Sequence, residues 1–247
     1  MVARIDQVTD PRIQADLRLA RRGTAYFSRK LAELPESELN GDSLLPGWTR
    51  RHVVAHVGYN ARALARLVEG VRTGSTGQMH VSRAERDEEI AFGATLPSNA
   101  LRNLHAHAAV HLDVEWRDLP DDRWQSPVIT DTGRRVAVAE TVWMRAREVW
   151  VHAVDLDNGG SFDHLPAEVL DRLLSDVLTT WTDHQDAGPG FNLFPSDRET
   201  KYTAGTGQGP SLTGTMAGIT RWALGRGGDG VRTAESLQRT PEPARWL

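Results

Sequence analysis

Apolar residues in the first 160 positions recur every three or four residues, the spacing that places side chains on one face of a helix. The pattern predicts four long helices, at about 10–34, 49–72, 98–119 and 139–156. Pro35 and Pro120 follow two of these segments, and Gly74 follows a third. A shorter helix is expected over about 82–92. Four long amphipathic helices with these breaks predict an antiparallel four-helix bundle.

Alternating and turn-rich segments interrupt this pattern at two places. Before the fourth long helix, SPVITDTGRRVAV predicts two short strands around the turn Asp131–Gly133. After Gly160 we expect a helix over 166–184, strands in FNLFPS, RETKYTAG and PSLTGT, and a last helix over 216–224. The expected fold is therefore mainly α, with a four-helix bundle over 1–161 and a smaller α+β domain over 162–247.

Composition narrows the class of protein. A chain of 247 residues is long enough for two domains, each with its own core. The net charge of -4 argues against a nucleic-acid-binding protein, which usually carries a positive excess. No apolar run reaches the roughly 20 residues that span a bilayer, and the N-terminal sequence lacks the apolar core of a secretion signal. We therefore expect a cytoplasmic protein without membrane or nucleic-acid partners.

The chain contains no cysteine. Disulfides, thiolate-ligated metals and a thiol nucleophile within the chain are thereby excluded. Any metal site must use His, Asp and Glu, and any sulfur chemistry requires a thiol from outside.

Two pairs of polar residues at one-turn spacing lie on otherwise apolar helix faces. Glu148 and His152 form one pair, and His52 and His56 form the other. Residues four apart project from the same side of a helix, and facing helices of a bundle can bring two such pairs together around a cation. A chance pattern or a hydrogen-bonded pair gives the same spacing, which His107 and His111 repeat. We interpret the remaining histidines as ordinary, exposed helix residues.

Imidazole and carboxylate ligands suit zinc. A structural zinc site is usually closed by four protein ligands, whereas three leave a position open for a reacting molecule. A site with three ligands from these pairs would therefore be catalytic.

Four segments resemble the mycothiol-dependent maleylpyruvate isomerases of the wider DinB-like superfamily of thiol-dependent metalloenzymes. They are LLPGWTRRHVVAHVGYNA, WMRAREVWVHAVDL, GRGGDGV and the terminal PEPARWL, and they occur in family order over nearly the whole chain. The first two are typical of the superfamily, and the C-terminal pair favours the isomerases. The resemblance implies a zinc-binding N-terminal bundle followed by a smaller domain.

Carried over residue by residue, the resemblance implies that zinc is held by His56, Glu148 and His152. His52 is then a neighbour, at the helix start or hydrogen-bonded to a ligand. The family's active-site arginine in its G-R-G motif matches Arg226. A guanidinium suits the carboxylates of a small dicarboxylate substrate and developing negative charge.

Two observations leave this arginine open to another interpretation. An arginine after a helix can instead satisfy the last helix carbonyls. In addition, Arg221 lies one turn before Arg226 and competes for the same role.

The implied activity is a cis-trans isomerisation of maleylpyruvate to fumarylpyruvate, as in aromatic catabolism of the gentisate type. Zinc would convert the low-molecular-weight thiol mycothiol into a thiolate. The hypothesis is that the thiolate adds to the cis double bond, the resulting single bond rotates, and elimination returns the thiol. Two alternatives stay open: a mycothiol S-transferase acting on electrophilic metabolites or xenobiotics, and a non-catalytic helical binding module.

Overall fold

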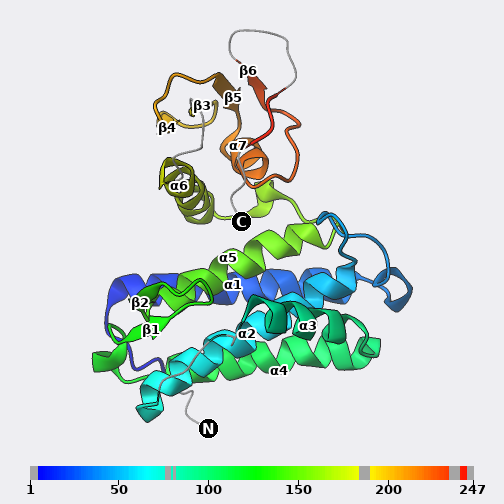
Figure 1. The fold of residues 1–247 in the computed structure, drawn as a ribbon, viewed down its shortest axis with the longest axis vertical. Coiled ribbons are helices and arrows are strands. Elements are labelled where there is room, and N and C mark those ends of the chain that lie inside the picture. The colour runs from blue at the N-terminus through cyan, green and yellow to red at the C-terminus, as the bar shows by residue number, and fades with distance from the viewer. Residues whose placement is uncertain (1–4, 76–78, 80–81, 184–189, 234–239, 244–247) are drawn as a thin grey trace. The chain divides into compact units, whose positions relative to one another are not determined.

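The chain forms two compact units, residues 1–160 and 161–247 (Figure 1). The computed structural model describes residues 5–75, 79, 82–183, 190–233 and 240–243. Each unit buries its own set of apolar side chains. The first is built from helices with one hairpin, and the second combines helices with a small sheet. The mainly α fold expected from the sequence is confirmed.

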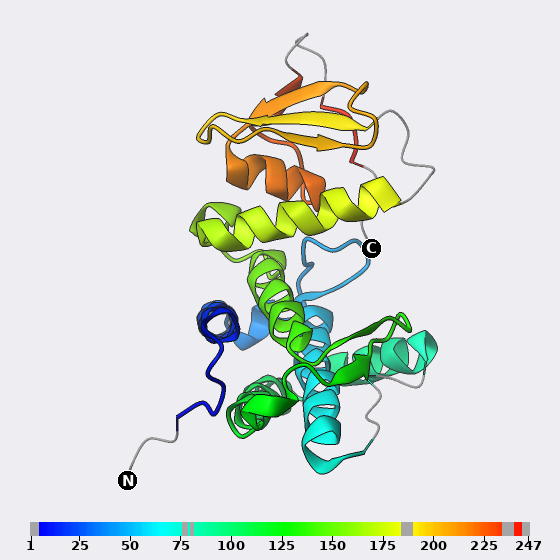
Figure 2. The same ribbon diagram turned by 90° about the vertical axis from the view of Figure 1, so that its left-hand side faces the viewer.

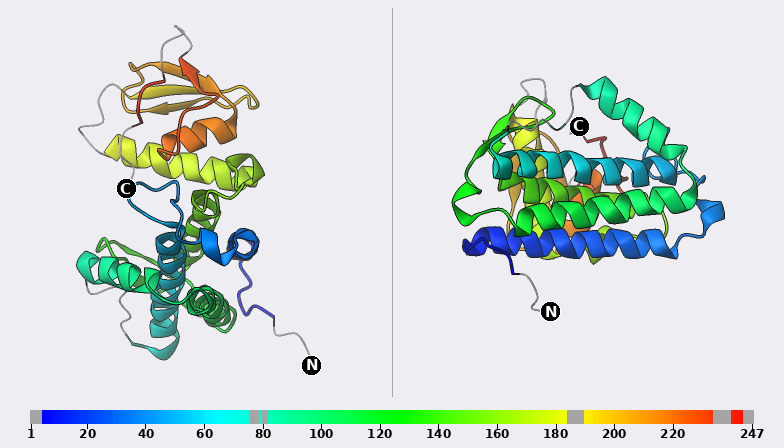
Figure 3. Two further views of the ribbon diagram at one scale, coloured as in Figure 1. Left: turned by 90° about the vertical axis from the view of Figure 1, so that its right-hand side faces the viewer. Right: turned by 90° about the horizontal axis from the view of Figure 1, so that it is seen from below.

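The first unit is a bundle of four long helices with one short helix added, which can be followed in Figures 1 and 3. The long helices are α1 (Pro11–Glu33), α2 (Arg50–Thr73), α4 (Ser98–Arg117) and α5 (Glu140–Asp155). The short helix α3 (Arg83–Ala94) packs against α2. Helix α2 also contacts α4 and α5, and α1 contacts α5. The expected bundle is confirmed, and α2 and α5 are neighbours within it.

Local sequence sets the ends of these helices. Asp10 accepts a hydrogen bond from the backbone N–H of Arg12, and Pro11 occupies the first turn, where its missing N–H costs nothing. Helix α1 ends just before Pro35. Helix α2 ends at Gly74, whose φ of 76° lies in the left-handed region that glycine adopts without strain.

Helices α1 and α5 approach closely at Gly23. A Cβ atom on this glycine would lie 2.6 Å from Cγ2 of Val149, so only glycine permits the observed separation. Trp150 fills the space beside it: its ring stacks on Tyr26 with centroids 5.3 Å apart, and its Nε1 donates to the carbonyl of Leu19 at 3.0 Å. This packing fixes the position of α5 in the bundle.

Short elements complete the first unit. The 3-10 turns η1 (Glu36–Glu38) and η2 (Asp121–Arg123) follow α1 and α4. The predicted hairpin is present: β1 (Pro127–Ile129) and β2 (Arg135–Ala137) pair antiparallel, with Val128 opposite Val136. None of the described helices is both long enough and apolar enough to cross a membrane.

The second unit contains a four-stranded sheet, and its helices pack on one face of this sheet (Figure 2). It contains η3 (Phe162–His164), α6 (Ala167–Asp183), α7 (Met216–Ala223) and the strands β3 (Phe191–Pro195), β4 (Tyr202–Ala204), β5 (Ser211–Gly214) and β6 (Arg232–Thr233). The strand order is β4-β3-β5-β6, and β3 and β5 run parallel, with Leu193 opposite Leu212. The other two pairs are antiparallel.

Aromatic side chains form the core of this unit. Trp181 on α6, Phe191 on β3 and Trp222 on α7 lie with ring centroids 5.0 to 5.7 Å apart. The three predicted strands are confirmed, although RETKYTAG contributes only its residues 202–204. Two sequence expectations lie outside the described residues. One is the end, at His184, of the helix expected over 166–184, and the other concerns residues 235–239 and 244–247 of the C-terminal tail. Strand β6 was not predicted.

Candidate metal centre

Three side chains from two helices converge inside the bundle: His56 from α2, and Glu148 and His152 from α5. Oε2 of Glu148 lies 2.8 Å from Nε2 of His56 and 3.1 Å from Nε2 of His152. The two imidazole rings stand perpendicular to each other, with centroids 4.8 Å apart. One ligand atom from each residue lies within 4.8 Å of the other two. The three residues implied by the resemblance are thus neighbours in space.

Helix geometry explains this convergence. Glu148 and His152 lie one turn apart on α5, so both side chains project towards α2. His56 lies in the second turn of α2, on a face that is otherwise apolar. The three side chains are 9%, 15% and 12% exposed for His56, Glu148 and His152. A ligand bound to them would be largely shielded from water.

A carboxylate outside the cluster orients one of the imidazoles. Nδ1 of His152 lies 2.8 Å from Oδ2 of Asp155, whose side chain is fully buried. With Nδ1 engaged in this way, Nε2 of His152 is directed at the cluster. Histidine ligands of metals commonly show this carboxylate contact, which fixes the ring and raises its basicity. Asp155 was not predicted as part of the site, although its spacing three residues after His152 was a usable signal.

The charges of the cluster depend on one another. Burial raises the pKa of Glu148, but hydrogen bonds from His152 and His56 outweigh this effect and hold the pKa well below its usual value. Burial lowers the pKa of His152, but Asp155 and Glu148 raise it more strongly, to about 9. Burial lowers the pKa of His56, against the opposing effect of Glu148. Without a metal, Glu148 is therefore ionised, His152 carries a proton and His56 is neutral.

The residues fit a divalent metal ion. Two imidazole nitrogens and a carboxylate oxygen are ligands that zinc binds, and an ion with three protein ligands keeps a position for a reacting molecule. The three ligand atoms already lie close together, and an outer carboxylate supports one of them. Zinc would displace the proton on His152, since a metal ligand must be neutral imidazole.

His52 lies outside this cluster and has a different task. Its Nδ1 accepts a hydrogen bond from the backbone N–H of Thr49 at 3.2 Å and lies 2.8 Å from the Thr49 hydroxyl. These two contacts belong to the cap at the start of α2. The indole of Trp48 lies beside both histidines, with ring centroids 6.2 Å from His52 and 5.5 Å from His56. His52 thus stabilises the helix end that carries His56.

Arg226 belongs to the second unit and follows α7. Its guanidinium donates to the carbonyl of Leu224, at the C-terminal end of that helix. Gly225 and Gly227 on either side have positive φ values of 74° and 96°. Arg221 donates to the carbonyl of Asp229. Arg226 therefore contacts a carbonyl at the end of the preceding helix, as the alternative interpretation of the motif expected, whereas Arg221 contacts a carbonyl of the following loop. The catalytic role of Arg226 stays a prediction.

The other histidines are mostly as expected, with one exception. His107, His111 and His164 are exposed, whereas His80 and His184 lie outside the described residues. His105 is 2% exposed, so the expectation of an exposed residue was wrong. Its Nε2 lies 2.8 Å from the Ser28 hydroxyl, and its ring lies 4.8 Å from that of Phe27. A polar partner on α1 makes this burial tolerable.

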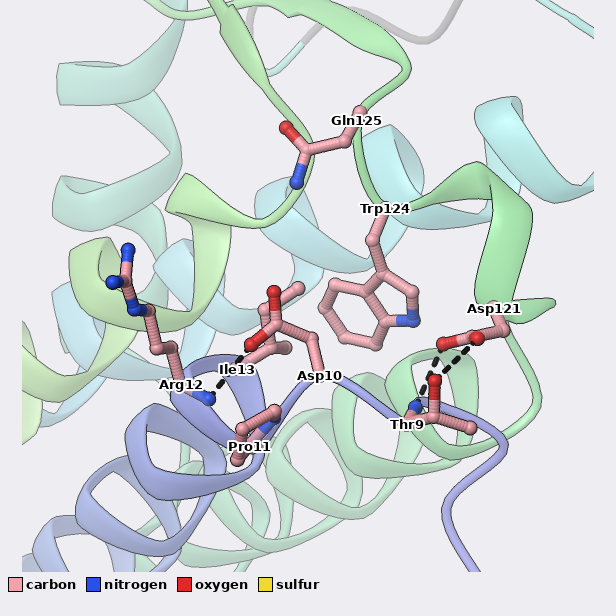
Figure 4. A pocket seen from close by; sticks show the side chains of 8 residues that line it. All are labelled: Thr9, Asp10, Pro11, Arg12, Ile13, Asp121, Trp124 and Gln125. Atoms are coloured by element: carbon pink, nitrogen blue, oxygen red, sulfur yellow. Dashed lines mark hydrogen bonds between the residues drawn. The ribbon is translucent and has the colours of Figure 1, made fainter.

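A separate surface pocket lies at the N-terminal end of α1 beside η2 (Figure 4). Its lining residues are Thr9, Asp10, Pro11, Arg12, Ile13, Asp121, Trp124 and Gln125. The carboxylate of Asp121 accepts from the N–H and hydroxyl of Thr9, at 2.7 and 2.6 Å, and Asp10 caps α1. These acids stabilise the fold, and none of the lining residues belongs to the metal cluster.

Two comparisons with known proteins gave matches. Residues 20–157 match the family model described as the mycothiol maleylpyruvate isomerase N-terminal domain. A crystal structure of the mycothiol-dependent maleylpyruvate isomerase is 45% identical, with a TM-score of 0.90 over 95% of this chain and 97% of that chain. A crystal structure of a mutant of that enzyme, with one histidine replaced by alanine, matches with the same values. Comparison with curated protein sequences gave no match.

The matched family model includes all three residues of the cluster, and the structural similarity extends over both units. The identity of 45% over almost the full length is far above what a shared fold alone would require. The chain belongs to the mycothiol-dependent maleylpyruvate isomerase family.

Proposed function

We propose that this protein is a zinc- and mycothiol-dependent isomerase that converts maleylpyruvate to fumarylpyruvate. Membership of the isomerase family gives the reaction class. The observation that carries the proposal is the convergence of His56, Glu148 and His152 within 4.8 Å inside the bundle. We infer that the metal-binding domain is residues 1–161 and that residues 162–247 form the second domain.

Each residue of the bundle site has a chemical task in this proposal. His56 and His152 would bind the ion through Nε2, and Glu148 through a carboxylate oxygen. Asp155 holds the ring of His152, so that Nε2 stays directed at the ion. A bound divalent ion would lower the pKa of a coordinated thiol and supply a thiolate at neutral pH.

The protein must also bind a substrate with two carboxylates and keep water from the reacting centre. The low exposure of the three ligands serves the second task. For the first, we propose Arg226 as the residue that binds a substrate carboxylate and stabilises negative charge in the transition state. This assignment rests on the family motif and on the geometric match between a guanidinium and a carboxylate.

One assay tests the proposal against its alternatives. Purified protein loaded with zinc is incubated with mycothiol and maleylpyruvate, and both isomers are followed by chromatography. We expect fumarylpyruvate to accumulate while the concentration of free mycothiol stays constant. A thiol adduct accumulating instead would identify an S-transferase. A protein that retains no metal after dialysis and produces neither product would be a non-catalytic module.

A further inference from the structure

A buried arginine lies beside the metal cluster. Arg145 is on α5, one turn before Glu148, and is 1% exposed. Its Nη1 donates to the carbonyl of Val57 at 2.7 Å and to Oδ1 of Asn60 at 3.1 Å, and both acceptors are on α2. The guanidinium therefore bridges the two helices that carry His56 and Glu148.

The positive charge of Arg145 has no directly bonded counter-charge. Both hydrogen-bond acceptors are neutral, and among the described residues no carboxylate lies within ion-pair distance of it. Its Nη2 is buried and has no hydrogen-bond acceptor among the described residues. An isolated buried charge is costly, so its presence calls for a function.

Arg145 stays cationic at neutral pH despite its burial. Burial lowers its pKa to about 10, and the negative charge of Glu148 opposes this decrease. Burial lowers the pKa of His105 on α4 to about 3, and the charge of Arg145 contributes to that shift. His105 is therefore neutral, and Arg145 remains charged in this part of the core.

Counting formal charges shows what this cation does to a loaded site. The carboxylates of Glu148 and Asp155 cancel the charge of a divalent ion, and His56 and His152 are neutral as ligands. Among these groups, the guanidinium then leaves one net positive charge. The charge of Arg86 also acts on His56, but Arg86 is paired with Asp87 at 3.6 Å. An anionic ligand would bring the buried site to neutrality, whereas a neutral ligand would not.

We propose that Arg145 is a positioning residue that acts through the metal site: its fixed charge favours an anionic ligand, such as a thiolate, over a neutral one. The inference rests on the proposed function, because it requires a metal at the cluster. It differs from the role of Arg226, which concerns the substrate and the second domain.

The test compares an anion with a neutral ligand on the same metal. The full chain is loaded with Co²⁺, and azide or imidazole is titrated while the visible absorption of the ion is recorded. In Arg145→Met, azide affinity should fall by about tenfold, since a unit charge is lost from a low-dielectric interior. Imidazole affinity should stay within about twofold of wild type. Arg145→Lys keeps the charge and should restore most of the azide affinity.

A matched control separates charge from helix bridging. Arg102 on α4 donates from both terminal nitrogens to the carbonyls of Leu31 and Leu34, each at 2.6 Å, and so also links two segments of the bundle. Arg102→Met should leave both ligand affinities unchanged. If Arg145→Met does not fold, Asn60→Asp places a carboxylate on Nη1 and neutralises the charge in place, with the same expected loss of azide affinity.

Two results would separate this inference from the proposed function. Unchanged azide affinity in Arg145→Met or Asn60→Asp, with metal bound, would overturn the inference even if the wild type isomerises maleylpyruvate. If wild type binds Co²⁺, and binds azide more tightly than Arg145→Met does, yet forms no fumarylpyruvate, the isomerase proposal is overturned and the inference stays in place.

Discussion

Oδ2 of Asp155 lies 2.8 Å from Nδ1 of His152, one turn earlier on the same helix. The side chain of Asp155 is fully buried and that of His152 is only 12% exposed, so water has little access to the contact. It therefore fixes the orientation of the imidazole before any metal binds.

Replacing Asp155 should weaken metal binding without unfolding the protein. Asp155→Asn keeps the size of the side chain but removes the charge that makes His152 a better ligand. We expect zinc affinity to fall by about 10- to 100-fold, measured by competition with a chromophoric chelator. Asp121→Asn is the control, because Asp121 accepts hydrogen bonds from Thr9 in the surface pocket beside η2. This variant should have the zinc affinity of wild type.

Removing the ligand from α2 should abolish metal retention. In His56→Ala the two ligands of α5 remain, but they cannot hold the ion alone. Zinc content after dialysis should drop from about one ion per chain to near zero, and isomerase activity should disappear with it. His111→Ala is the matched control, because His111 also belongs to an H-x-x-x-H pair but is exposed. Full zinc retention by His56→Ala would refute the assignment of this ligand.

Metal affinity should rise with pH over a defined window. His152 must lose its proton to bind zinc, and its pKa is raised to about 9 in the metal-free protein. Zinc affinity should therefore increase as pH rises towards about 9. Isothermal titration calorimetry in buffers of different ionisation enthalpy measures the protons released. Binding at pH 7 with no proton release would contradict the raised pKa.

The same shift affects the stability of the metal-free protein. His152 has a folded-state pKa above its ordinary value of 6.5, so its contribution to the free energy of unfolding is fully present below pH 6.5 and is lost as pH rises through about 9. Thermal melting with chelator present should show this loss. Saturating zinc should remove the dependence, because the metal then replaces the proton. If the melting temperature falls with pH equally steeply with and without zinc, His152 is not the source of the pH dependence.

Arg226 should affect substrate use and leave the metal unaffected. In Arg226→Met we expect at least tenfold lower kcat/KM for maleylpyruvate, the range for losing one charged hydrogen bond in the transition state. Zinc content should equal that of wild type. Arg221→Met serves as the comparison, because Arg221 was the competing candidate. If Arg221→Met loses activity while Arg226→Met keeps it, Arg221 binds the substrate and the assignment of Arg226 is wrong.

The close approach of α1 and α5 at Gly23 predicts a stability effect. Gly23→Ala would place a methyl group 2.6 Å from Cγ2 of Val149, so the helices must separate or the side chain must move. We expect a loss of about 1–3 kcal/mol in the free energy of unfolding, measured by urea denaturation. Arg22→Ala, at an exposed position of the same helix, should change it by less than about 0.5 kcal/mol.

The helices and the ligand pairs could be predicted because their signals are local. Proline, glycine and capping residues mark where α1 and α2 begin and end, and one-turn spacing puts Glu148 and His152 on one side of α5. The short strand β6 could not be predicted. Its two residues, Arg232 and Thr233, have no periodic pattern and form a strand through pairing with β5.

Sequence alone determined which side chains share a helix face, because the period of a helix depends on its backbone geometry and on no other segment. Only the tertiary structure decided that α2 lies against α5, which brings His56 to within 2.8 Å of Glu148. It also decided the burial of His105 and of Arg145. Burial and counter-charges depend on neighbours far apart along the chain, and these become neighbours only when the helices pack.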